Sequence, residues 1–127
     1  MNSNDFSKGD VLKATKRKKD EGYHYIIYYE RNSNEDFIGC MITHSISSQN
    51  EEMYDIHFEL LDEIGNKYPV GYDKTLLVKG KFCKLENWSP FTKVGALTAA
   101  GISFVEEVVG DLPLESFSDH CDRNQHN

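Results

Sequence analysis

The sequence lacks the features of a membrane-inserted or secreted protein. No apolar run approaches the roughly 20 residues that a helix needs to cross a bilayer. Residues 1–7 have neither the basic start nor the apolar stretch of a secretory signal. Hydrophobic residues make up 39% of the 127 positions and charged residues 28%, which excludes a disordered chain. We therefore expect a cytoplasmic globular protein with no membrane association.

Cysteine is scarce, and its three positions do not suggest a disulfide framework. Cys40 and Cys83 lie in apolar, strand-like runs, and Cys121 lies in a polar tail. An odd number of cysteines with no close pair favours structural thiols that stay reduced. His120 and His126 flank Cys121, but a polar tail does not hold metal ligands rigidly. The chain also lacks a glycine-rich phosphate loop, so we expect neither a metal nor a cofactor.

Basic charge is limited overall but concentrated in one place. The formal net charge is −7 with histidine neutral, which argues against a protein that coats nucleic acid over its whole surface. A local basic loop on an acidic protein can still steer a polyanion into a cleft. The alternative interpretation is an ordinary solvated hairpin loop. The clustered basic residues are Lys13, Lys16, Arg17, Lys18 and Lys19.

Short apolar and β-branched runs separated by turn signals predict a β structure. Residues 23–30 form the strongest run, dense in tyrosine and isoleucine. Residues 54–60 alternate apolar and polar, which predicts a half-buried strand with its four apolar side chains turned to the core. Gly39 and Gly80 predict bends within their strands. The remaining strands are expected at 10–15, 37–45, 76–85 and 93–97, and residues 47–52 are expected to form a loop.

A helix is expected near the C-terminus. Thr98 is positioned to cap residues 99–109, whose apolar side chains recur at helical spacing. We predict a mainly β fold with a C-terminal helix, either an SH3-like barrel or a strongly curved antiparallel sheet of five to six strands. We expect a single domain over 1–127, with an ordered core at about 8–113 and a flexible tail at 114–127.

Polar residues at the ends of two apolar strands indicate a place for chemistry. His24 lies at the start of the strongest strand, and Thr43, His44 and Ser45 end the next one. If these strands pair as a hairpin through the turn at 31–36, both sets meet beside the basic loop. Histidine can transfer the protons of RNA cleavage, while a cation or hydroxyl stabilises the charged phosphate. The alternative is a strand-end histidine hydrogen-bonded to the backbone and a threonine chosen for strand propensity.

Four short motifs follow one another in an informative order. They are Lys-Gly-Asp-Val at 8–11, Gly-Tyr-His-Tyr with an apolar strand at 22–28, Met-Ile-Thr-His-Ser at 41–45, and Phe-Thr-Lys-Val-Gly-Ala-Leu at 91–97 before a helix. This order resembles that of the PemK/MazF toxin family. The resemblance implies an SH3-like barrel, usually a homodimer, that cleaves single-stranded RNA and is neutralised by a cognate antitoxin.

The resemblance also assigns roles to residues. The family's catalytic arginine aligns with His24, and the threonine of its Ile-Thr-Ser motif aligns with Thr43. Histidine does not reproduce the bidentate phosphate contact of arginine. If the chain is active, His24 has taken over acid–base duty and a residue of the basic loop holds the phosphate. On this reading we expect His24, Thr43 and Ser45 to be catalytic. The substrate-binding residues are expected to be Lys16, Arg17, Lys18, Lys19 and His44. The alternatives are a catalytically inactive barrel that binds a protein or nucleic acid, and a small-molecule enzyme on a similar barrel.

Overall fold

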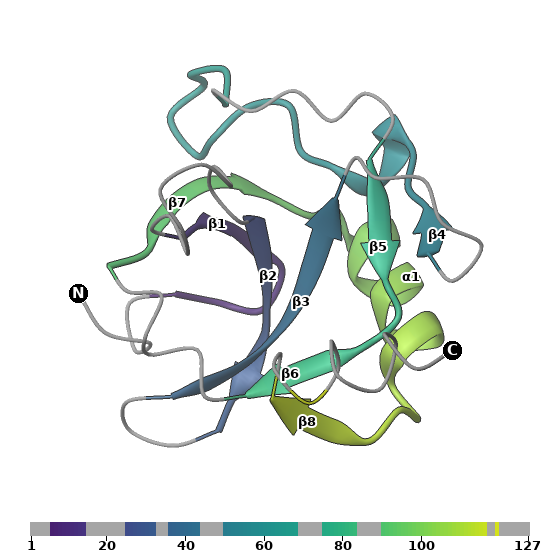
Figure 1. Ribbon diagram of the computed structural model, residues 1–127. Coiled ribbons are helices and arrows are strands. Elements are labelled where there is room, and N and C mark those ends of the chain that lie inside the picture. Colours follow the sequence, from purple (N-terminus) through teal and green to yellow (C-terminus); the bar gives the residue numbers. More distant parts are fainter. Residues whose placement is uncertain are drawn as a thin grey trace.

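The computed structural model describes residues 6–14, 25–32, 36–43, 50–68, 75–83, 90–116 and 119. Within these residues eight strands share one sheet, and a single α-helix follows the seventh strand (Figure 1). The strands are β1 (Asp10–Lys13), β2 (Tyr25–Arg31), β3 (Phe37–Thr43), β4 (Asn50–Glu52), β5 (Leu76–Val78), β6 (Lys81–Cys83), β7 (Thr92–Ala96) and β8 (Leu114–Ser116). The helices are the 3-10 helix η2 (Asp55–His57) and α1 (Ala99–Val109).

The sheet is mainly antiparallel and does not close on itself within the described part of the chain. Its order is β4-β5-β3-β2-β1-β7, and β6 joins β3 to β8. The β6–β8 pair is parallel, and every other pair is antiparallel. The predicted mainly β fold with a C-terminal helix is thus confirmed. The strand count rises from the expected five or six to eight because the run at 76–85 divides into β5 and β6, and because β4 and β8 form in segments expected to be a loop and a tail.

Irregularities in the register bend this sheet. Tyr28 pairs with Gly39, and the next pair joins Glu30 to Ile38, so Tyr29 is an extra residue on β2. The expected irregularity at Gly39 is therefore present, but the bulged residue belongs to the partner strand. A second shift lies between β1 and β7. Extra residues of this kind increase local twist, as a curved sheet requires.

Both faces of the central strands are buried. Because successive side chains of a strand point to opposite faces, Ile27 joins a cluster that includes Val105 of α1, while Ile26 joins a second cluster around Phe82. Cys40 belongs to the cluster under the helix, where burial raises the pKa of its thiol to about 12. Cys40 is therefore a structural thiol rather than a reactive one.

The helix matches its prediction. α1 spans Ala99–Val109, and the Thr98 hydroxyl accepts a hydrogen bond from the Gly101 N–H. The bend predicted at Gly80 is also confirmed, because this glycine separates β5 from β6. No helix in the described part of the chain combines the length and the apolar character needed to span a membrane.

The prediction of a strand at 54–60 is wrong. Residues 55–57 form η2 instead, and Phe58 is the one buried residue among the four expected to face the core. His57, expected on the polar face, is 6% exposed. Tyr54 explains the change, because its N–H donates to His57 Nδ1 at 2.9 Å and its carbonyl accepts from the His57 N–H. These two hydrogen bonds close a tight turn, and neither could form if residues 54–57 were extended as a strand.

Two polar segments form strands that the sequence did not suggest. β4 lies within the loop expected at 47–52 and pairs with β5. β8 lies at the start of the expected tail and pairs with β6. Neither segment has apolar alternation, and each gains its hydrogen bonds from an available sheet edge.

Candidate functional site

The hairpin that the sequence predicted is present, and it aligns three strand ends. Lys13 at the end of β1 pairs with Tyr25 at the start of β2, and Tyr25 pairs with Ile42 near the end of β3. Thr43, the next residue, is half-buried and pairs with Leu76 of β5. We call this group of strand ends the Tyr25 edge.

Of the predicted catalytic and RNA-binding residues, the structure describes Thr43. The others lie outside the described residues: Lys16, Arg17, Lys18, Lys19, His24, His44 and Ser45. The hairpin places the residues that precede or follow two of them in the sequence: Tyr25 follows His24, and Thr43 precedes His44.

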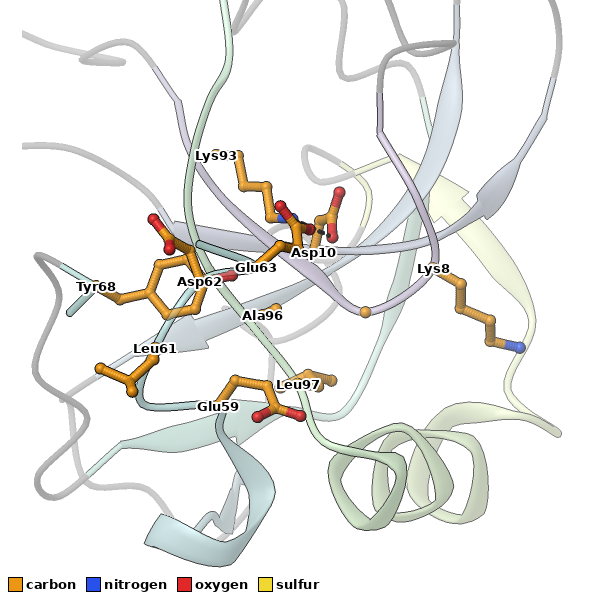
Figure 2. Close-up of a pocket in the computed structure, with 11 residues that line it drawn as sticks. Lys8, Asp10, Glu59, Leu61, Asp62, Glu63, Tyr68, Lys93, Ala96 and Leu97 are labelled. Atoms are coloured by element: carbon orange, nitrogen blue, oxygen red, sulfur yellow. Dashed lines mark hydrogen bonds and ion pairs between the residues drawn. The ribbon is translucent and has the colours of Figure 1, made fainter. Parts of the chain in front are cut away.

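A pocket of about 400 Å³ lies at the other end of β1 (Figure 2). Asp10 opens β1 and Lys93 comes from β7, while Glu59, residues 61–63 and Tyr68 come from the segment after η2. The apolar wall of the pocket is formed by Leu61, Leu97 and the Tyr68 ring. The charged residues that line the pocket are Lys8, Asp10, Glu59, Asp62, Glu63 and Lys93.

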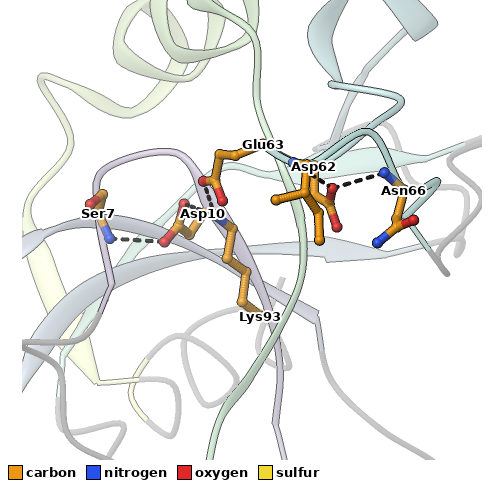
Figure 3. Close-up of polar contacts among 7 residues, drawn as sticks. Ser7, Asp10, Asp62, Glu63, Asn66 and Lys93 are labelled. Atoms are coloured by element: carbon orange, nitrogen blue, oxygen red, sulfur yellow. Dashed lines mark hydrogen bonds and ion pairs between the residues drawn. The ribbon is translucent and has the colours of Figure 1, made fainter.

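Asp10 and Lys93 form the most buried ion pair of this pocket (Figure 3). Lys93 Nζ lies 3.3 Å from Asp10 Oδ1 and 3.4 Å from Glu63 Oε1. The Ser7 N–H donates to the other Asp10 oxygen at 2.9 Å. Burial by itself lowers the pKa of Lys93, but the charge and hydrogen bond of Asp10 outweigh it and raise that pKa.

The electrostatics of this pocket favour binding over proton transfer. Lys93 stays an ammonium group because its pKa is raised, so it cannot serve as a base near neutral pH. Burial also raises the pKa of Tyr68, whose phenol therefore stays protonated. The Glu59 carboxylate makes no hydrogen bond or ion pair with the described residues. The pocket thus offers a charged wall, an apolar wall and an unpaired carboxylate.

Two further contacts of α1 join it to the sheet and to η2. Tyr29 on β2 donates its hydroxyl to the Glu106 carboxylate on α1, and Lys8 Nζ lies 3.6 Å from Glu106 Oε2. Burial and then the bond to Glu106 raise the pKa of Tyr29 well above its usual value. His57 stacks on Phe104 of α1 with ring centroids 4.4 Å apart. These contacts hold α1 against β2 and η2. No local sequence pattern predicts them, because each joins segments that are far apart in the chain.

No protein-family model, curated protein or solved structure matches the chain. Among the described residues, no three His, Cys, Asp or Glu side chains are arranged to hold a metal ion. The resemblance to PemK/MazF toxins therefore stays a prediction made from short motifs.

Proposed function

We propose that the chain is a metal-independent endoribonuclease of the PemK/MazF type, which acts as a homodimer on single-stranded RNA and is neutralised by a cognate antitoxin. The register of the Tyr25 edge is the observation that carries the proposal. Lys13 pairs with Tyr25, and Tyr25 pairs with Ile42. The segments expected to supply the basic residues, His24 and the Thr43 motif therefore join the sheet at one end.

The proposed reaction needs two proton transfers and no metal. His24 takes the proton of a ribose 2′-OH, whose oxygen attacks the adjacent phosphorus and displaces the 5′-oxygen. The leaving 5′-oxygen takes a proton from water, so the products are a 2′,3′-cyclic phosphate and a free 5′-OH. The hydroxyls of Thr43 and Ser45 donate to the phosphate oxygens. The basic segment and His44 hold the neighbouring phosphates.

The charge distribution supports this end of the sheet over the pocket. Asp10 begins β1 and Lys13 ends it, and three residue steps along a strand span about 10 Å. The pocket end has four carboxylates, whereas the cluster of basic residues begins at Lys13. A phosphate chain is repelled by the first and attracted by the second.

Expression in bacterial cells tests the proposal. The wild-type chain should arrest growth, and His24→Ala should relieve the arrest. Thr43→Val keeps a β-branched side chain but removes the hydroxyl, and it should weaken the arrest. His126→Ala removes an imidazole from the C-terminal segment, and Ser103→Ala removes an exposed hydroxyl on α1. Both controls should remain toxic.

Two results would contradict the proposal. One is normal growth with the wild-type chain at a level where folded protein is recovered. The other is an equal arrest by wild type and by His24→Ala. The first result would favour the alternative in which the protein binds a partner without catalysis.

A further inference from the structure

Residues 60–68 form an ordered hairpin beside the pocket. The Tyr68 N–H donates to the Leu60 carbonyl at 3.2 Å, and the Asp62 N–H donates to the Asn66 carbonyl at 2.8 Å. Asp62 Oδ1 accepts from the N–H groups of Ile64 and Asn66 (Figure 3). Gly65 has φ +90, a conformation that favours glycine. Polar turn chemistry therefore holds this hairpin in place, without burial of its large apolar side chains.

Those apolar side chains are turned to solvent. Leu60 is 68% exposed, Leu61 52% and Ile64 82%. Tyr54 and Ile56, on the preceding turn, are also exposed. Among the described residues, Leu114 is the one large exposed hydrophobic outside this segment. A concentration of apolar side chains on a rigid surface is typical of an interaction site.

The same stretch is strongly acidic. Residues 51–63 contain six carboxylates and no lysine or arginine. Glu63 pairs with Lys93, and Glu51 pairs with Lys79 at 3.0 Å. Glu59 has no such partner in the described part of the chain, and it lines the pocket (Figure 2). Exposed apolar and acidic side chains therefore share this stretch. We call the 54–64 surface its exposed residues Tyr54, Asp55, Ile56, Glu59, Leu60, Leu61, Glu63 and Ile64.

We propose that the 54–64 surface binds a basic amphipathic segment of a partner protein, one Lys or Arg side chain of which enters the pocket. The aliphatic stem of that side chain would pack on Leu61 and Leu97, and its charged head would pair with Glu59. Charge complementarity favours this occupant, because the surface repels nucleic acid and anionic membranes. The proposal does not depend on RNA cleavage at the Tyr25 edge.

Fluorescence anisotropy with two labelled synthetic peptides tests this surface. One peptide is amphipathic and built from leucine and lysine, and the other has glutamate in place of every lysine. The lysine peptide should bind the wild-type protein, and added salt should weaken the complex. Ile64→Ser should weaken binding by about tenfold, since it removes most of an exposed apolar contact. Glu59→Gln should also weaken it.

Matched variants separate this surface from general stickiness. Leu114→Ser removes the exposed leucine of β8, which lies at the opposite end of the molecule from the 60–68 hairpin (Figure 1). Glu107→Gln removes an exposed carboxylate of α1. Both should bind the lysine peptide as the wild type does. The four variants should keep the wild-type circular dichroism spectrum, and Ile64→Ser should keep any RNA cleavage.

Three results would overturn the proposal. The first is equal binding of the lysine and glutamate peptides, and the second is equal affinity for wild type, Ile64→Ser and Leu114→Ser. The third is concentration-dependent self-association that Ile64→Ser abolishes, because it would assign the surface to a second copy of this chain.

Discussion

The carbonyl oxygen of His57 lies inside the space that a side chain on Gly101 would need. The same carbonyl accepts a hydrogen bond from the Thr98 N–H at 3.0 Å, and the Thr98 hydroxyl donates to the Ile56 carbonyl at 2.6 Å. The first turn of α1 is therefore seated directly on the backbone of η2. This contact fixes the position of the 54–64 surface relative to the sheet.

Gly101→Ala should disturb this contact. Alanine favours a helix more than glycine does, but its Cβ meets backbone that cannot rotate away. We expect the free energy of unfolding to fall by about 1–3 kcal/mol, as for other overpacked sites. Urea denaturation measures the change. Ser103→Ala, on the exposed side of α1, is the control and should alter stability by about 0.5 kcal/mol or less. A Gly101→Ala protein more stable than the wild type would contradict this packing.

His57 should make stability depend on pH. Burial lowers the pKa of its imidazole below the ordinary 6.5, and Nδ1 accepts the Tyr54 N–H. The unfolded chain therefore takes up this proton first as the pH falls. Stability should be complete above about pH 6.5 and should decline from there toward the lowered folded pKa. His57→Asn keeps an acceptor near the Nδ1 position without titrating, so it should flatten the decline. Identical pH profiles for the two proteins would contradict the assignment.

Thr75 is a site for a stabilising substitution. Its side chain is 1% exposed, and its hydroxyl oxygen has no hydrogen-bond partner among the described residues. Thr75→Val replaces the hydroxyl with a methyl group of similar shape. Because it removes an unsatisfied buried polar atom, thermal or urea unfolding should show a gain of about 1 kcal/mol. Thr92→Val, at an exposed position of β7, should give little change. A clear loss of stability in Thr75→Val would mean that the hydroxyl is satisfied.

The Asp10–Lys93 pair should contribute more than a surface ion pair. The Asp10 side chain is 10% exposed and that of Lys93 is 31% exposed. A double-mutant cycle with Asp10→Asn and Lys93→Met should give a coupling of about 1 kcal/mol. The more exposed Lys79–Glu51 pair provides a comparison, with an expected coupling of about 0.5 kcal/mol or less. Equal couplings for the two pairs would show that partial burial adds nothing.

Local signals in the sequence predicted the elements that depend mainly on local chemistry. The aromatic and β-branched run before Glu30 predicted β2, and Thr98 with its apolar stripe predicted α1. The alternation at 54–60 failed because the hydrogen bonds between Tyr54 and His57 close η2, and the first turn of α1, far along the chain, packs against the His57 carbonyl. β4 was missed because its polar residues pair with an edge that the sequence does not reveal.

The two candidate sites were likewise predictable only where they depend on local sequence. The β2–β3 hairpin was predictable from its two apolar runs and the turn between them, and Tyr25 does pair with Ile42. The Asp10–Lys93 pair was not predictable, since it depends on the pairing of the first strand with the seventh. The exposure of Leu60 was not predictable either, because the alternation at 54–60 placed it on the buried face of a strand, in line with the usual burial of large apolar side chains.

The most direct test of the proposed function is incubation of purified protein with a long single-stranded RNA in EDTA, followed by analysis of the RNA ends. The proposal predicts discrete cuts that end in 2′,3′-cyclic phosphate and 5′-OH, that persist in EDTA and that are absent with His24→Ala. RNA that stays intact over a wide excess of protein, or cuts that His24→Ala makes equally well, would contradict it.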